Sequence, residues 1–256
     1  MSVFCIGQDY RNTLIFDHMT KYIFSTMTRR CGSITFIQVG ANDGQRADPI
    51  QAFVQSGKWK GVMIEPVPFV FDKLRENYQT QEFGIVFENC AVGRADGSAV
   101  FYACREPHSP LSSFDKQNIL KHSDWALSVG LPDPKDYIEE IVVPVFTLET
   151  ICNRNEVRHI DILLTDTEGY DCKAIQSLNL DRIRPSVIYF EHVHCQDDDT
   201  MALRKELYTK KYQLIYDAYN CCAVLPEAIG DLPLINTFQE ILIDASNLRT
   251  LVSAKT

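Results

Sequence analysis

The stretch ITFIQVGANDG, from Ile34 to Gly44, decides how the fold is built. Its first six residues, 34–39, are mostly apolar and β-prone, which predicts a buried strand. The turn that follows, 40–44, begins and ends with glycine, and glycine lets the backbone approach a ligand without a Cβ atom in the way. Because ligands of open α/β sheets bind at the carboxyl ends of strands, we expect a ligand at this turn.

Short apolar strands and helices alternate along the chain after this turn. Strands are expected at 61–65, 85–89, 140–146, 160–164 and 185–190, and helices at 49–55, 69–78, 147–153, 170–178 and 197–210. Pro49 is expected at the first position of its helix. The alternation is typical of an α/β fold, so we predict a doubly wound, mostly parallel sheet with helices on both faces.

The two ends of the chain differ from this alternation. Residues 13–30 have apolar side chains at helical spacing, which predicts a helix laid over the sheet within an N-terminal extension, 1–33. Closing antiparallel strands are expected at 212–217, 223–225 and 240–244. We therefore expect one domain over 34–256 behind a helical extension.

Two segments in the middle of the chain interrupt the pattern. Asp96-Gly97, inside the alternating stretch ADGSAVFYAC, predicts a β-hairpin turn. Residues 105–137 contain four prolines and no long periodicity, which indicates a long insertion. Long insertions in compact domains often act as lids or substrate loops, although a plain surface excursion fits the same composition.

Composition excludes several classes of protein. The 256 residues are 45% hydrophobic, enough for a folded core, and the net charge of −9 argues against binding nucleic acid or an anionic membrane. The nine cysteines are odd in number and include no CxxC pair, which favours reduced thiols. The sequence shows neither the basic start nor the apolar segment of a signal peptide, and it has no apolar run of membrane length. We therefore expect a cytoplasmic protein without a membrane span. The oligomeric state stays open.

Polar groups follow four of the expected strands, at 40–44, at Glu65, at 89–91 and at 166–169. The carboxyl ends of parallel strands meet at one edge of a sheet, so these groups should lie together. Glu65 ends the strand after the glycine turn, where a carboxylate can accept hydrogen bonds from both hydroxyls of a ribose.

NAD and S-adenosylmethionine both contain such a ribose, and the turn distinguishes between them. A dinucleotide fingerprint needs G-x-G-x-x-G, whereas this turn reads GANDG and carries Asp43. A carboxylate there would repel a pyrophosphate and attract the sulfonium and ammonium of S-adenosylmethionine. The turn favours S-adenosylmethionine, and an NAD(P)-dependent oxidoreductase or epimerase is the alternative.

Five motifs in order carry a resemblance to a known family: VGANDG (39–44), IEPVPFVFDKLRENY (64–78), NCAVG (89–93), VPVFTLETI (143–151) and IDILLTDTEGYDCKAI (160–175). Over 34–195 the sequence resembles the FkbM-type methyltransferases. The resemblance implies the class I methyltransferase (Rossmann-like) fold and an S-adenosylmethionine-dependent O-methyltransferase. Its acceptor would be a small molecule or glycan with a hydroxyl group.

The resemblance also implies roles for individual residues. Those expected to bind the donor are Gly40, Asn42, Asp43 and Gly44 at the methionine part, Glu65 with Pro66 at the ribose, and Cys90 and Ala91 at the adenine. Ser112 either reaches the adenine side from the insertion or forms a turn. Asp166 and Glu168 match the acidic D-x-E-G motif of the family's active site, but Thr165 replaces the lysine that many members have.

Methyl transfer to a hydroxyl requires removal of its proton by a base or activation by a metal. Asp166 is expected either to act as the base, beside the donor, or to hold a divalent cation, and Glu168 and His192 are further catalytic candidates. The sequence HVHC, 192–195, resembles a metal cluster but is not specific, so the use of a metal stays open. A silent S-adenosylmethionine-binding module is the third alternative.

Overall fold

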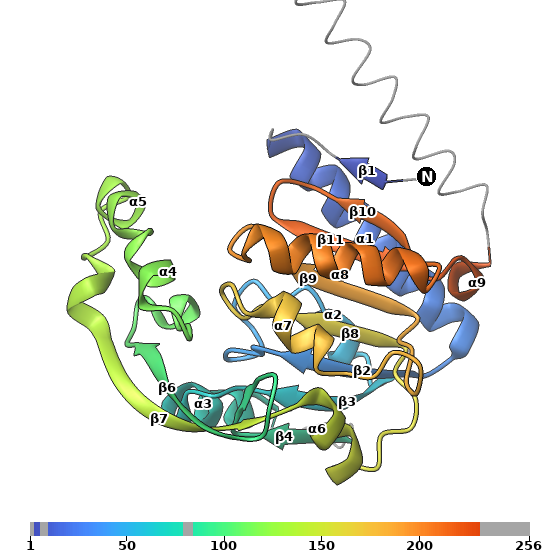
Figure 1. The fold of residues 1–256 in the computed structure, drawn as a ribbon, viewed down its shortest axis with the longest axis horizontal. Coiled ribbons are helices and arrows are strands. Elements are labelled where there is room, and N and C mark those ends of the chain that lie inside the picture. The colour runs from blue at the N-terminus through green and yellow to red at the C-terminus, as the bar shows by residue number, and fades with distance from the viewer. Residues whose placement is uncertain (1–2, 6–9, 79–83, 231–256) are drawn as a thin grey trace, which may run out of the picture.

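A computed structural model of the chain describes residues 3–5, 10–78 and 84–230, with side chains from residue 16 onward. Its large sheet has the strand order β1-β10-β11-β9-β8-β2-β3-β4 (Figure 1). The strands are β1 (Val3–Cys5), β2 (Ile34–Val39), β3 (Trp59–Ile64), β4 (Ile85–Glu88), β8 (Ile162–Thr165), β9 (Val187–Glu191), β10 (Gln213–Tyr216) and β11 (Asn220–Val224). Only β11 runs antiparallel to its neighbours, so the predicted mostly parallel sheet is confirmed.

Helices cover both faces of this sheet, as predicted. One face packs against α1 (Tyr10–Cys31), α2 (Gln51–Gln55), α3 (Pro68–Tyr78) and α9 (Pro226–Ile229). The other face packs against α6 (Leu148–Arg154), α7 (Asp171–Gln176) and α8 (Asp197–Thr209). Alternate residues of β2 enter the two cores, with Phe36 on the α1 side and Ile37 on the α7 side. This two-sided burial explains the continuous apolar sequence of β2.

The N-terminal helix α1 lies on the sheet, as the helical spacing predicted. Its buried side chains include Phe16, Ile23 and Phe24, and Phe24 packs edge-on against Trp59 of β3. The indole Nε1 of Trp59 also donates to the hydroxyl oxygen of Thr28, 2.9 Å away. The short strand β1, which was not predicted, pairs in parallel with β10 at the sheet edge.

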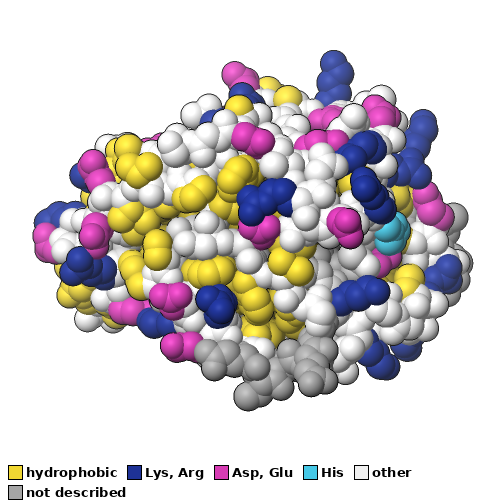
Figure 2. Space-filling view, turned by 90° about the horizontal axis from the view of Figure 1, so that it is seen from below, with side chains coloured by type: hydrophobic (Ala, Val, Ile, Leu, Met, Phe, Trp, Pro, Cys, Tyr) yellow, Lys and Arg dark blue, Asp and Glu magenta, His cyan; other side chains and the backbone are white. Residues whose placement is uncertain are grey.

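A second sheet has the order β5-β7-β6 and contains β5 (Ala91–Val92), β6 (Gly97–Cys104) and β7 (Ile138–Phe146). The hairpin predicted at Asp96-Gly97 is wrong, because β6 pairs antiparallel with β7 along its whole length rather than with β5. The Asp96 carboxylate instead accepts a hydrogen bond from the backbone N–H of Thr147, just before α6. Figure 2 shows the underside of the molecule, where hydrophobic and charged side chains are mixed.

The helix expected from Pro49 begins later, at Gln51. The Asp48 carboxylate accepts a hydrogen bond from the backbone N–H of Ile50 and so holds a turn ahead of the helix.

The predicted insertion is not structureless: it contains η1 (Ser109–Leu111), α4 (Lys116–Leu120), α5 (Ser123–Ser128) and η2 (Pro134–Tyr137). In Figure 1, α4 and α5 lie beside one end of the large sheet. The strand predicted at 240–244 lies outside the described residues.

Candidate active site

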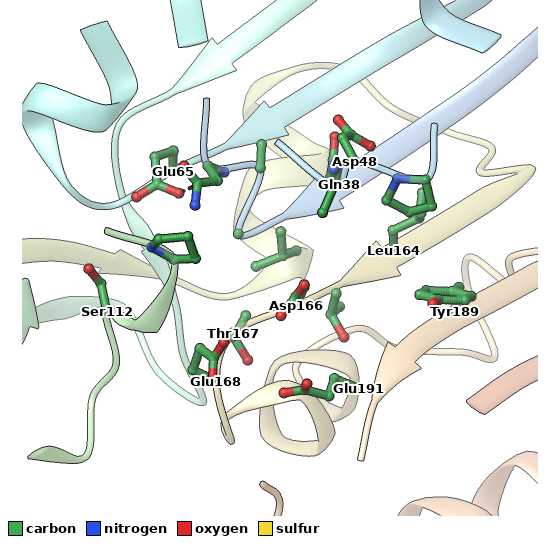
Figure 3. Close-up of a pocket in the computed structure, with 18 of the residues that line it drawn as sticks. Gln38, Asp48, Glu65, Ser112, Leu164, Asp166, Thr167, Glu168, Tyr189 and Glu191 are labelled. Carbon is green, nitrogen blue, oxygen red and sulfur yellow. Dashed lines mark hydrogen bonds between the residues drawn. The ribbon is translucent and has the colours of Figure 1, made fainter. Parts of the chain in front are cut away.

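A cavity of about 590 Å³ lies at the carboxyl ends of β2, β3, β8 and β9. It brings together most of the residues selected from the sequence (Figure 3). Those residues are Gly40, Asn42, Glu65, Pro66, Cys90, Ala91, Ser112, Asp166 and Glu168. One wall comes from the insertion, through Ser109, Pro110, Ser112 and Phe114, and another comes from α1.

The glycine turn and Glu65 are joined directly. Asn42, with a left-handed φ of 47°, donates its backbone N–H to one Glu65 carboxylate oxygen over 3.0 Å. The other oxygen accepts from the backbone N–H of Val67, also over 3.0 Å. A carboxylate can accept about four hydrogen bonds, so both oxygens keep capacity for hydroxyl donors in the cavity. Burial raises the pKa of Glu65 to about 7.

Gly40 occupies the point where the ends of β2 and β8 meet. Its φ is +75°, and a Cβ atom there would lie 1.8 Å from the backbone oxygen of Asp166. The backbone N–H of Asp166 donates to the carbonyl of Val39 over 3.0 Å, which fixes the two strand ends to each other. The absence of a side chain at residue 40 therefore sets the position of Asp166.

Three carboxylates form an acidic edge along the lower part of the cavity in Figure 3: Asp166, Glu168 and Glu191. Each offers an oxygen, and these oxygens lie within 4.8 Å of one another. Asp166 is open to the cavity, but the surrounding protein displaces bulk water and raises its pKa to about 7, with the Asp171 carboxylate adding to the effect. The same displacement of water, together with the Asp166 charge, raises the pKa of Glu168 and of Glu191.

The loop after β4 shapes the opposite side of the cavity. The Asn89 side chain donates to the backbone carbonyls of Glu65 and Pro66, at 2.8 and 3.2 Å, and so holds the end of β3. Burial raises the pKa of the Cys90 thiol to about 12, so Cys90 stays neutral. Ser112 lines the cavity although its hydroxyl is already bonded to the backbone of Cys104 and Ser109.

Three selected residues do not line the cavity. The Asp43 carboxylate accepts the backbone N–H groups of Gln45 and Arg46, at 2.9 and 2.8 Å, and so closes the turn on itself. Gly44, at φ +70°, makes room for the Tyr78 ring, 2.5 Å from where its Cβ would lie. The His192 Nε2 atom lies 3.1 Å from the carbonyl oxygen of Asp217. Asp43 and Gly44 thus shape the turn, and His192 packs beyond the cavity.

A protein-family model, described as the methyltransferase FkbM domain, matches residues 38–214 of the sequence. The chain belongs to the FkbM methyltransferase family. Membership implies S-adenosylmethionine as the methyl donor. The large sheet is accordingly the mostly parallel sheet of an α/β class I methyltransferase-like fold, to which this chain adds β1. No helix in the described part of the chain is long and apolar enough to cross a membrane.

Solved structures similar to this FkbM-family chain are distant in sequence. The methyltransferase FkbM from Methylobacillus flagellatus KT has 17% identity and a TM-score of 0.46, over 75% of this chain and 43% of that one. This chain thus spans less than half of that protein. An O-methyltransferase from Bacillus cereus has 10% identity and a TM-score of 0.38, over 81% and 80% of the two chains. A comparison with curated proteins gave no match.

Several residues of this FkbM-family cavity were not selected from the sequence. They are Asp17, Thr20, Lys21 and Phe24 from α1, Gln38 from β2, Asp48 from the turn before α2, Leu164 and Thr167 in and after β8, Tyr189 from β9 and Asn220 from β11. The sequence could have indicated Gln38 as a site residue, since it is a polar residue near the end of an otherwise apolar strand. Nothing in the sequence indicated that the α1 residues reach the cavity, because the contact of α1 with the cavity depends on tertiary packing.

The raised pKa of Glu65 predicts a pH dependence of stability. Between about pH 4.5 and 7 the folded state keeps a proton on Glu65 that the unfolded state has released, so the free energy of unfolding falls as pH rises. Glu65→Gln should remove this dependence, so that wild type loses on the order of 2 kcal/mol relative to the variant across that range. Urea unfolding of both proteins at several pH values measures the free energy of unfolding and its pH dependence. Glu76→Gln, an exposed change on α3, is the control and should leave the wild-type pH dependence in place.

Proposed function

We propose that this chain transfers a methyl group from S-adenosylmethionine to a hydroxyl group of a small molecule or glycan. One observation carries the proposal: the glycine turn, Glu65 and Asp166 surround a single cavity and are fixed to one another by backbone contacts. Family membership supports the methyl donor. The chemistry of the cavity supports the hydroxyl acceptor.

The cavity has groups suited to each part of the donor. Glu65 offers free acceptor capacity to a ribose diol. Neutral, largely apolar groups, Pro66, Cys90 and Ala91, suit the adenine, with Ser112 beside them. Gly40 and Asn42 are proposed at the methionine part, where the acidic edge favours a ligand that carries positive charge.

When bound, S-adenosylmethionine supplies an electrophilic methyl group on a sulfonium. The acceptor oxygen forms a bond to that carbon as the carbon–sulfur bond breaks, and the hydroxyl proton must leave. We assign the proton to the Asp166 carboxylate, whose pKa of about 7 suits a general base near neutral pH. Glu168 and Glu191 complete the acidic edge, with oxygens within 4.8 Å of that of Asp166. We assign no proton transfer to His192.

A hydroxyl-rich acceptor fits the part of the cavity between β2, β9 and α1. Gln38 and Asp48 each have a buried side-chain oxygen without a hydrogen-bond partner among the residues that the structure describes. Asn220 and Lys21 line the same part of the cavity. Since unpartnered buried polar atoms are costly, a ligand with several hydroxyl groups would be favoured there over an apolar one.

The charges of the cavity argue against the dinucleotide alternative. Its lining contains six carboxylates and two cations, Lys21 and Arg46, and Arg46 already pairs with Glu106 at 3.3 Å. A pyrophosphate would add negative charge to a cluster of acidic groups whose pKa values are already raised. A cationic sulfonium would instead be attracted to these groups and would favour their ionised form.

Thermal-shift titration tests the assignment of the donor. S-adenosylhomocysteine should raise the melting temperature, whereas NAD and NADP at equal concentration should not, because only a ligand of the native state stabilises it. Glu65→Gln should weaken S-adenosylhomocysteine binding by about 10–100-fold, the cost of losing hydrogen bonds to a charged group. A larger shift with NAD, or unchanged affinity in the variant, would contradict the proposal. Methyl transfer to a panel of sugars would then identify the acceptor.

A further inference from the structure

A second group of side chains lies beside the cavity and joins three distant parts of the chain. His122 directly precedes α5 in the insertion, Glu168 follows β8, and His194 follows β9. The Nε2 atoms of His122 and His194 lie 4.0 and 3.6 Å from the same oxygen, Oε2 of Glu168. The two imidazole rings lie edge to face with centroids 5.3 Å apart.

These distances are too long for hydrogen bonds and close to those within a metal site. Ligand atoms about 2.0–2.1 Å from a tetrahedral ion lie about 3.4 Å apart, so a small closure of this group would complete three corners of a tetrahedron. The Nε2 atom of His122 is buried and has no hydrogen-bond partner in the described part of the chain. A bound ion or a water would satisfy a buried imidazole nitrogen of this kind.

Burial and the Lys121 ammonium set the electrostatic surroundings of the two histidines. Burial, the neighbouring ring and Lys121 lower the pKa of His194 to about 4, and burial together with Lys121 lowers that of His122. Metals bind the neutral form of imidazole, which offers a nitrogen lone pair. The Lys121 Nζ donates to the neutral Asn118 side chain over 2.6 Å and keeps its charge, so the Glu168 carboxylate is the negative group that a bound cation would meet.

The backbone at Glu168 is held in a costly conformation that points its side chain at this group. Its φ is +52°, in the left-handed region that residues with a Cβ rarely occupy. The Ser113 hydroxyl and the Asn118 amide, both from the insertion, donate to its backbone carbonyl over 2.8 and 2.9 Å. Strained residues fixed in this way cluster at functional sites.

We propose that His122, Glu168 and His194 bind a divalent transition-metal ion, with zinc as the ion that best fits two imidazoles and one carboxylate. The ion would join the insertion to the ends of β8 and β9, next to Asp166. Because three protein ligands leave one position of a tetrahedral ion open, a water or another oxygen ligand could complete the site. The site is independent of which acceptor is methylated.

The neighbouring acidic group, Asp166, Glu168 and Glu191, offers a different ligand set that shares Glu168. Three carboxylates suit Mg²⁺, which prefers oxygen, whereas imidazoles suit zinc. Each set contains one buried atom without a hydrogen-bond partner in the described part of the chain, Nε2 of His122 and Oε2 of Glu191. The approach of both histidine nitrogens to the same Glu168 oxygen favours the histidine set. The two sets therefore make different predictions about which metal binds and which variants lose it.

Calorimetric titration of Zn²⁺ into tag-free, chelator-treated protein tests the site without any activity assay. One Zn²⁺ should bind per chain and raise the melting temperature, and Co²⁺ should bind with the visible absorption of a tetrahedral site. His122→Ala and His194→Ala should each weaken binding by about 100-fold or more, since even changes beyond the ligands cost 10–100-fold. His18→Ala, which removes an exposed histidine of α1, should bind Zn²⁺ like wild type.

Three results would overturn the proposal. The first is no binding of Zn²⁺ by wild type, and the second is unchanged binding in both histidine variants. The third is binding of Mg²⁺ alone that Glu191→Gln abolishes and His122→Ala leaves intact, which would assign the ion to the acidic group. Melting curves recorded without metal will establish that each variant is folded.

Discussion

Asp166→Asn should lower the rate of methyl transfer by about 10²–10⁴-fold, the usual contribution of a general base, while S-adenosylhomocysteine still binds within about tenfold of wild type. Asparagine keeps the size of the side chain but cannot take up the proton of the acceptor hydroxyl. The backbone of Asp166 would stay in place, because its contacts with Val39 and Gly40 do not involve the side chain. Single-turnover rates and calorimetry measure the two quantities separately.

The pattern of loss in this variant separates the alternatives. Asp72→Asn, an exposed change on α3, should have wild-type rates and controls for the chemistry of the substitution. A rate for Asp166→Asn close to wild type would assign the proton to another group of the acidic edge. Loss of donor binding together with the rate would make Asp166 a binding residue. A chain that binds the donor but transfers no methyl group even as wild type would be the silent module.

The parts of the fold that follow from local signals were predictable from the sequence. Strand β2 has the predicted bounds, 34–39, because apolar residues on both of its faces and a glycine turn define it locally. Pairings between distant segments were not predictable in the same way. The Asp96-Gly97 turn looks like a hairpin, yet β6 gains a longer partner in β7, which lies beyond the insertion.

The residues of the candidate site also fall into predictable and unpredictable groups. Gly40, Glu65 and Asp166 could be selected because each follows a strand, and parallel strands bring their ends together. Lys21 of α1 and Tyr189 of β9 could not, since only the packing of α1 on the sheet brings them to one cavity. Likewise, nothing in the sequence relates His122 to His194, and the fold of the insertion alone brings them together.

Gly40→Ala should abolish donor binding more completely than any change of a charged residue at the site. A methyl group at residue 40 would lie 1.8 Å from the Asp166 oxygen, whereas real contacts are at least 3.0 Å, so the ends of β2 and β8 would have to separate. The atom in the way is backbone, so no rotation of a side chain can relieve the overlap. A displacement of about 1 Å in a site can lower the reaction rate on the order of 100-fold, and we expect a loss of similar size in donor affinity. The left-handed φ of Gly40 adds strain of about 1 kcal/mol.

Gly32→Ala separates these two contributions. Gly32 has the same φ of +75° but has nothing within 4 Å of its Cβ position, so alanine there meets only the backbone strain. Gly32→Ala should lose about 1 kcal/mol of unfolding free energy and keep wild-type affinity for S-adenosylhomocysteine. Gly40→Ala should lose about 3 kcal/mol or more and bind the donor at least about 100-fold more weakly. Equal effects of the two changes in urea unfolding and calorimetry would mean that the close contact between Gly40 and Asp166 does not hold the site together.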